Sequence, residues 1–323
     1  MKSRESRSFI SSGLKFSIGI TIVFLGSLYL SGCSVSEKKP PSKKEWPAPA
    51  WKKEEVNKQK EMTLKPVTLV FGPGLAKAFA SAGVLKALEE NKVPIKAIVG
   101  TGFGAIVGGL YVSSRSIHDF EWKLTRFKKK IFPGLSRKPE LLNDPKSDFY
   151  RTLDSLLVGK QLQSLKTSFA MTSFTASDSS ISYLQRGALL SAIKASIGIP
   201  KWVSVGRWGG QRAYSGALIA PYPVTWAQER WNAPVIVISV TDSRVNESSK
   251  PYPESLDFDA QMAMGQLLHQ DALSKAALVI RPHLSGIGYF DFSKIHSIMF
   301  RGRKETLSKM NQIRQLLISA EKD

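Results

Sequence analysis

The residues with the clearest chemical pattern form the pentapeptide Gly100-Thr101-Gly102-Phe103-Gly104. An apolar run at 95–99 precedes it and a small-residue segment to 112 follows, which predicts a buried strand, a turn and a helix. Glycine-flanked turns of this kind form nucleophile elbows, which expose a central hydroxyl for attack on an ester or amide. The central residue here is Gly102, which has no hydroxyl, so the pattern alone is equally typical of a structural turn.

A second glycine-rich turn, Gly72-Pro73-Gly74, follows an apolar run at 66–71. Dinucleotide-binding loops share this G-x-G spacing, but their third glycine would fall at Lys77, and Pro73 lacks an N–H that could face a phosphate. No G-K-S/T sequence is present to form a P-loop, and four His with one Cys supply few metal ligands. The sequence therefore predicts no nucleotide cofactor and no metal site.

The elements that position these turns predict an α/β fold. Further strands are expected at 168–175, 234–241 and 277–280, and helices at 76–91, 184–196 and 223–230. Strands that alternate with helices predict a three-layer sandwich, in which helices cover both faces of a mainly parallel sheet. Sites in such sheets form at the carboxyl ends of the strands, where both glycine turns lie.

Several segments, in order, resemble patatin-like phospholipases. Residues 69–74, 83–90 and 98–105 are similar to that family's oxyanion loop, Gly-Val-Leu helix and elbow. Residues 189–200 resemble its helix that ends in Ala-Ser-x-x-x-Pro, and 214–224 its catalytic-base loop with the following Pro-Val. Residues 280–282 and 291–292 are similar to the bacterial branch related to neuropathy target esterase. The resemblance implies a patatin-like domain over 66–323.

In that family an elbow Ser attacks a lipid ester, an Asp of the later loop activates it, and the glycine loop stabilises the oxyanion. The matching positions are Gly102 for the Ser, Ser215 for the Asp, Gly72, Pro73, Gly74 and Lys77 for the oxyanion loop, and Gly100, Thr101, Phe103 and Gly104 for the rest of the elbow. Gly102 offers no nucleophile, Ser215 is no base near neutral pH, and Pro73 donates no hydrogen bond. The resemblance therefore implies a pseudoenzyme that binds lipid or a protein partner.

Two alternatives stay open at this point. A lipid acyl hydrolase with a non-standard nucleophile would use Ser113, Ser114, Ser173 or Ser196, with Asp178, Asp242 or His269 as a partner. A structural envelope protein would use the domain as a spacer. If a fatty acid or phospholipid binds, the small residues Gly104, Ala105, Gly108 and Gly109 are expected to leave room for it beside the elbow.

The N-terminal region predicts export and a lipid anchor. Four basic residues precede the apolar run 16–30, and Leu30-Ser31-Gly32-Cys33 follows it, an order typical of a secretory signal. This tetrapeptide resembles the bacterial lipobox, which implies a signal peptide at 1–32 and an acylated Cys33. Ser34 favours the outer membrane, facing the periplasm. An uncleaved membrane anchor is the alternative. The Lys/Glu/Pro-rich segment 33–65 is expected to be a flexible tether.

The charge balance points to an anionic partner. The chain has 46 Lys and Arg against 26 Asp and Glu, a formal charge of +20, which suits nucleic acid or an anionic membrane. Export argues against nucleic acid. Candidates for a membrane surface, in which basic and aromatic residues alternate, are Trp122, Lys123, Arg126, Lys128, Lys129 and Lys130. A solvated basic loop is the alternative interpretation.

Overall fold

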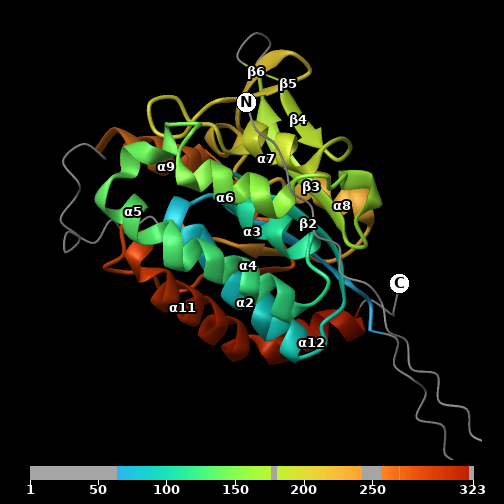
Figure 1. Ribbon diagram of the computed structural model, residues 1–323. Helices are drawn as coiled ribbons and strands as arrows, with labels where there is room; N and C mark the ends of the chain where they lie inside the picture. The colour runs from blue at the N-terminus through green and yellow to red at the C-terminus, as the bar shows by residue number, and fades with distance from the viewer. Residues whose placement is uncertain (1–63, 176–179, 242–255, 269, 320–323) are drawn as a thin grey trace, which may run out of the picture. The chain divides into compact units, whose positions relative to one another are not determined.

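The computed structural model describes residues 64–175, 180–241, 256–268 and 270–319 (Figure 1). The chain divides into two units, 1–58 and 59–323, and the described residues all belong to the second. The predicted signal peptide, Cys33 and nearly all of the tether therefore lie outside the described residues, as do Asp178, Asp242 and His269. None of the helices in the described ranges is both long and apolar enough to cross a membrane.

The described strands form one eight-stranded sheet in the order β5-β6-β3-β2-β1-β7-β8, with β4 paired to β3. The strands are β1 (Val67–Phe71), β2 (Ile95–Gly100), β3 (Ser168–Phe174), β4 (Ile181–Leu184), β5 (Gly206–Trp208), β6 (Gln211–Ser215), β7 (Val235–Ile238) and β8 (Leu278–Ile280). The pairs β3–β2, β2–β1, β1–β7 and β7–β8 are parallel, whereas β3–β4, β3–β6 and β6–β5 are antiparallel.

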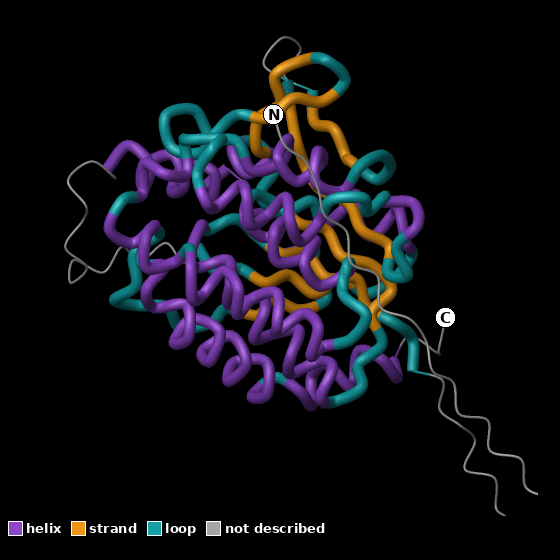
Figure 2. The backbone as a smooth tube through the Cα atoms, viewed as in Figure 1, coloured by secondary structure: helices purple, strands orange, loops and turns teal. Residues whose placement is uncertain are grey.

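Helices cover both faces of this sheet. The described helices are α2 (Ala80–Glu90), α3 (Phe103–Val112), α4 (Ile117–Lys130), α5 (Phe132–Arg137), α6 (Asp148–Leu157), α7 (Leu189–Ile197), α8 (Val224–Trp231), α9 (Leu256–Leu268), α10 (Gln270–Ser274), α11 (Ile295–Ser308) and α12 (Met310–Ser319). Successive side chains of a strand point to opposite faces. Leu69 and Phe71 accordingly join the large core that includes α2, α3 and α11, and Val70 joins the smaller core beneath α8. Figure 2 shows the strands between these layers. The prediction of a three-layer, mainly parallel fold is confirmed.

Two predicted elements differ from the observed ones. The helix expected at 184–196 begins only at Leu189, because Ile181–Leu184 forms strand β4 antiparallel to β3. The helix expected at 76–91 is divided into a 3-10 turn, η1 (Leu75–Phe79), and α2 from Ala80. The 3-10 turn follows Gly74, which has a φ of +154°. Leu75, next to it, has a φ of +46°, and together these two conformations turn the chain sharply away from β1.

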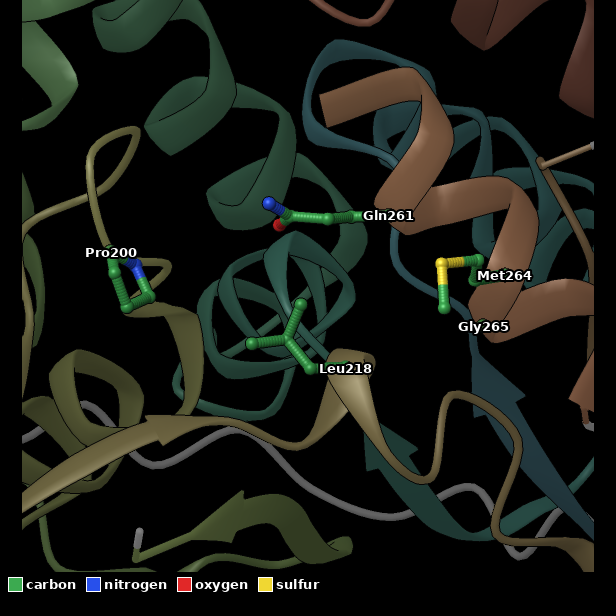
Figure 3. A pocket seen from close by; sticks show the side chains of 5 residues that line it. All are labelled: Pro200, Leu218, Gln261, Met264 and Gly265. Atoms are coloured by element: carbon green, nitrogen blue, oxygen red, sulfur yellow. The ribbon is translucent and has the colours of Figure 1, made fainter. Parts of the chain in front are cut away.

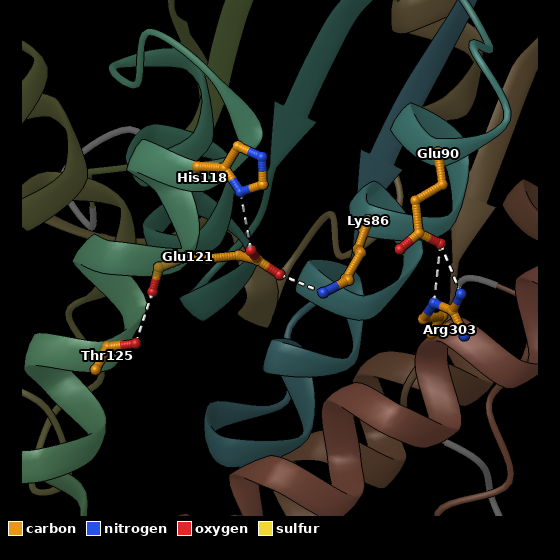
Figure 4. Close-up of polar contacts among 6 residues, drawn as sticks. All are labelled: Lys86, Glu90, His118, Glu121, Thr125 and Arg303. Carbon is orange, nitrogen blue, oxygen red and sulfur yellow. Dashed lines mark hydrogen bonds and ion pairs between the residues drawn. The ribbon is translucent and has the colours of Figure 1, made fainter.

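Helix α2 lies between α4 and α11 (Figure 4). Lys86 pairs with Glu121 of α4, and Glu90 pairs with Arg303 of α11 at 2.7 Å. The contact with α11 is much closer than these ion pairs require. A Cβ on Gly83 would lie 1.8 Å from the Met299 carbonyl oxygen, and a Cβ on Gly302 would lie 2.1 Å from the Ala80 carbonyl oxygen. The two helices therefore pack backbone to backbone.

Substitution Gly83→Ala tests this packing. An alanine usually stabilises a helix by up to about 1 kcal/mol over glycine. At this position we expect the opposite sign, a loss of about 1–3 kcal/mol in the free energy of unfolding, because the added methyl group overpacks the interface. Urea denaturation measures the change. The matched control is Gly265→Ala in α9, whose Cβ would meet its nearest atom at an ordinary 3.5 Å and which should not destabilise the protein.

Candidate functional site

Strand β3 brings the two positions of the expected dyad together. Strand β2 ends where Gly100 pairs with Met171, and β6 ends where Ser215 pairs with Ser173. Both lie on the same side of β3, because β4 occupies its other side at Met171 and Ser173. Gly100 and Ser215 are therefore two residues apart along β3, which is about 7 Å. The elbow after β2 and the loop after β6 meet at this point.

The turn after β2 has the geometry expected of an elbow. Gly102 has φ +56° and ψ −131°, a conformation that glycine adopts at little cost. The N–H of Thr101 donates to the Phe71 carbonyl oxygen at 3.0 Å, and the N–H of Ala105 donates to that of Gly102 at 2.9 Å. A Cβ on Gly104 would lie only 2.4 Å from the Phe71 oxygen. The turn is thus pressed against the end of β1.

A side chain at position 102 would be in tight contact with its neighbours. A Cβ built there would lie 3.2 Å from the Cβ of Pro73 and 3.5 Å from that of Ala217. Pro73 comes from the oxyanion-loop position and Ala217 from the base-loop position, and both are buried. The three segments of the expected active site therefore converge, and their contact at position 102 is apolar and tight.

The base position holds a neutral, satisfied side chain. Ser215 is fully buried, and its Oγ accepts a hydrogen bond from the N–H of Ala217 at 3.2 Å in the 3-10 turn η4 (Gly216–Leu218). The N–H of Ser215 donates to the Gly198 carbonyl oxygen at 2.8 Å. The hydroxyl therefore caps a local turn and has no base to activate it or nucleophile to act on.

The other hydroxyls near the elbow also have hydrogen-bond partners. Thr172 Oγ1 donates to Thr101 Oγ1 at 3.2 Å, and Ser173 Oγ donates to the backbone oxygens of Ala195 and Tyr214. Ser196 Oγ donates to the Ala192 oxygen at 2.7 Å. Within the described ranges, none of these hydroxyls is hydrogen-bonded to a carboxylate or a histidine. The geometry offers them no general base.

The oxyanion loop has lost donors. The N–H of Gly72 donates to the Ile238 carbonyl oxygen at 3.1 Å, as a continuation of the sheet, and Pro73 has no N–H. The ring of Tyr222 lies where a Cβ on Gly72 would be, 2.5 Å from Cε1. Lys77, at the end of the loop, places its ammonium group 4.3 Å from the centre of the Tyr289 ring. These residues stabilise the loop and do not open it to a substrate.

The small residues after the elbow do not leave room for a ligand, and the expectation that they would is wrong. A Cβ on Gly108 would lie 2.6 Å from the Phe169 ring, and one on Gly109 would lie 2.4 Å from Ile193. Glycine is needed here because α3 packs closely against β3 and α7, and the neighbouring side chains fill the space.

A cavity opens on the outer side of η4 instead. It has a volume of about 360 Å³ and is lined by Pro200, Leu218, Gln261, Met264 and Gly265 (Figure 3). In Figure 3, Gln261 and Met264 project from α9, and Leu218 and Pro200 lie across from them. The cavity adjoins the base-loop position, because a Cβ on the lining residue Gly265 would lie 3.5 Å from the Ala217 carbonyl oxygen. Sequence reasoning missed this cavity, although residues 260–268 are an uncharged, Met-rich run.

The basic segment near residue 122 is a helix, α4, and not the loop that was the alternative expectation. Lys123 is not part of the exposed surface of α4. Its side chain is 8% exposed, and Nζ donates to Ser113 Oγ at 3.1 Å and to Ser114 Oγ at 3.0 Å. Both hydroxyls in turn donate to the Leu110 carbonyl oxygen. Lys123 therefore binds the two hydroxyls that cap the C-terminus of α3, which also explains Ser113 and Ser114 without catalysis.

The remaining candidates on α4 differ in exposure. Trp122 is 56% exposed, and the Arg126 guanidinium lies 5.2 Å from its ring centre. Lys129 is exposed and Lys128 is half-buried, whereas the side chain of Lys130 lies outside the described part. The buried aromatic residues of this helix belong to the core.

Comparisons with known proteins relate this chain to one family. Residues 69–227 match the family described as patatin-like phospholipase. An uncharacterized NTE family protein of Mycobacterium tuberculosis is 30% identical over 162 residues, which are 49% of this chain and 44% of that relative. Lysophospholipase NTE1 of Debaryomyces hansenii is 22% identical over 266 residues, 73% of this chain and 17% of its own length. The crystal structure of VipD from Legionella pneumophila aligns with a TM-score of 0.48 at 12% identity, over 78% of this chain and 67% of that one.

The buried Lys123 predicts a pH dependence of stability. Burial lowers its pKa in the folded protein, an effect that nearby Asp119 opposes. Because the folded-state pKa lies below the unfolded value of about 10.4, folding disfavours the charged form, and the penalty disappears as pH rises above the folded pKa. We therefore expect the wild type to gain stability relative to Lys123→Met between neutral pH and about pH 10. Urea denaturation across this range measures the difference; parallel curves for the two proteins would contradict the prediction.

Proposed function

Because the chain belongs to the patatin-like phospholipase family, a family of lipid-directed hydrolases, we propose that it is a non-hydrolytic member that binds a lipid acyl chain at the cell envelope. The observation that carries the proposal is the apolar contact of Pro73 and Ala217 with the position of the nucleophile. Near this tight contact lies the cavity, which is lined by Leu218 of η4 and by residues of α9.

The replaced residues would each lower the rate of hydrolysis by a large factor. Loss of the nucleophile from a concerted catalytic set lowers turnover by about a million-fold. Loss of one oxyanion donor lowers it by roughly a further 100- to 1000-fold. In this chain Gly102 removes the first, Pro73 removes one donor, and Ser215 removes the base. The hydroxyls that remain nearby donate to backbone oxygens or to one another.

The case for lipid binding rests on the cavity. Its volume of about 360 Å³ lies within the range of small-molecule sites, roughly 300–1,000 Å³. Gln261 is the one polar side chain among the five lining residues, and none of the five is charged. A neutral, elongated apolar group fits such a lining, and one amide can bind an ester or carboxyl oxygen. A fatty acid or one chain of a phospholipid has this chemistry.

The envelope location is part of the same proposal and rests on the sequence. An acylated Cys33 would anchor the protein to a membrane, facing the periplasm from the outer membrane, and residues 33–65 would tether the domain. The exposed Trp122 and the cations Arg126, Lys128 and Lys129 of α4 suit an anionic lipid surface, with Lys123 now excluded. A protein partner at the envelope is the other ligand that this proposal allows.

Hydrolysis of a generic acyl ester tests the loss of catalysis. We expect no turnover by the wild type above buffer, and none by Gly102→Ser/Ser215→Asp, because the new Cβ would lie only 3.2 Å from that of Pro73 and Pro73 still supplies no oxyanion donor. Adding Pro73→Gly, which frees this space and restores a backbone donor, should bring turnover measurably above buffer, because one oxyanion donor contributes roughly 100- to 1000-fold. Turnover by the wild type that a single change such as Thr101→Val abolishes would instead favour a hydrolase with a non-standard nucleophile.

Binding of a radiolabelled long-chain fatty acid tests the cavity. In the variant Gly265→Phe the ring would fill the volume that an acyl chain needs, so we expect at least about tenfold weaker binding. Gly265→Ala is the matched control, which adds only a methyl group at 3.5 Å from its nearest neighbour and should keep the affinity within a few-fold. Equal binding by the phenylalanine variant would exclude this cavity as the lipid site.

A further inference from the structure

Helix α9 has one anchored face and one exposed apolar face. Phe258 and Met262 belong to the core, and Gly265 is buried against η4. Met264 and Leu267, in contrast, are 62% and 67% exposed. These two residues are three positions apart and therefore lie on neighbouring parts of the helix surface. The two side chains form a small exposed apolar patch beside the cavity, and apolar patches next to ligand sites are where membrane contacts are found.

The core side of α9 holds it firmly in place. Phe258 packs edge to face against Trp202 and Tyr289, with ring centres 5.7 and 5.2 Å apart. At the first turn of the helix, Asp257 pairs with Lys201 at 2.9 Å. The exposed side chains therefore project from a positioned element and not from a loosely packed one.

The exposed face adjoins the mouth of the cavity. Met264 both lines the cavity and is largely exposed, so it forms part of the rim, whereas Leu267 lies one turn further along the helix and does not line it. No charged residue occurs between 260 and 268. Along α9 itself, therefore, no charged residue separates this face from the cavity.

We propose that α9 also contacts the membrane, with Met264 and Leu267 inserted at the interface of an anionic bilayer so that the cavity opens towards the acyl chains. The inference rests on the proposed function for the identity of the ligand in the cavity. The inference goes beyond the proposed function because it assigns the surface through which that ligand arrives.

Charge and area favour a bilayer over a protein partner as the occupant of this face. The formal charge of +20 attracts the chain to anionic lipid. Two side chains present much less surface than the roughly 800 Å² per partner that a stable protein interface buries. A few inserted apolar side chains are a common size for interfacial membrane contact, in which a tether supplies the local concentration.

A polarity-sensitive label on α9 tests this directly. Cys33 is the only cysteine, so the full chain with Cys33→Ser and Leu267→Cys has a single thiol for an NBD fluorophore. The matched control carries the label at Phe300→Cys on α11, where the native side chain is 63% exposed. Sedimentation would not report on α9, because the apolar run 16–30 of the full chain is expected to partition into vesicles as well, whereas the label reports on its own surroundings.

With vesicles of phosphatidylcholine and phosphatidylglycerol, we expect the fluorescence at position 267 to rise at least about twofold and to be quenched by nitroxide-labelled lipid. The label at position 300 should change little. A label at 267 that stays in water, whether or not the protein sediments, overturns the inference. So does a rise without vesicles as protein concentration increases, which would show that a second copy covers the face.

The variant Gly265→Phe separates this inference from the proposed function. Filling the cavity should abolish acyl-chain binding but leave Leu267 free to insert, so the label at 267 should still respond to vesicles in this background. If the label responds normally while the wild type binds no fatty acid, the proposed ligand is wrong and the membrane contact stands. If fatty acid binds but the label does not respond, only the membrane contact is wrong.

Discussion

The register of strand β3 is the constraint on which the site depends. One side of this strand is paired first with β2 and then, after β2 ends, with β6. The two strands approach end to end, so the turn after one and the loop after the other must share a small volume. Gly216 shows how closely they are held, because a Cβ there would lie 2.3 Å from the Thr172 hydroxyl. Whatever residues stand at positions 102 and 215, this pairing keeps them together.

Given that proximity, the chemical nature of the residues decides between a reactive site and a stable one. A carboxylate at a fully buried position must be compensated by several hydrogen bonds or a counter-charge. Ser215 accepts the one N–H that Ala217 offers and brings no charge. Gly102 takes the positive φ of the elbow without strain. The remnant of the site is therefore satisfied as a piece of protein interior, and it has no unpaired group that would call for a substrate.

The sequence predicts well those features that depend on local pattern. The apolar runs and the glycines predict β1, β2 and the elbow between β2 and α3, because a buried parallel strand and a tight turn each need particular residue types. The hairpin β5–β6 was missed, although Gly209-Gly210 with positive φ at both residues is a recognisable two-residue turn. Lys123 was misassigned because the dense basic residues hid the helical period that places Phe120, Lys123 and Phe127 on the buried side of α4.

The cavity lies beyond such reasoning for a different reason. Its lining comes from three separate segments, around 200, 218 and 261–265, which tertiary packing alone brings together. Each segment, taken by itself, has an ordinary explanation as a turn or a core helix. The exposure of Met264 and Leu267 is likewise a property of how α9 is seated, since nothing in the sequence distinguishes them from the buried Met262.

The altered residues of the site are coupled through packing and are not independent losses. Pro73 lies where it would meet any side chain at position 102, and Ala217 lies beside both. A serine at 102 next to Pro73 would carry an overpacking cost that glycine avoids. The effects of changes at 73 and 102 must then be non-additive, as is usual for residues in contact. The tight packing at the nucleophile position is accordingly a property of the Pro73–Gly102–Ala217 contact as a unit, whereas the cavity beside η4 is lined by other residues.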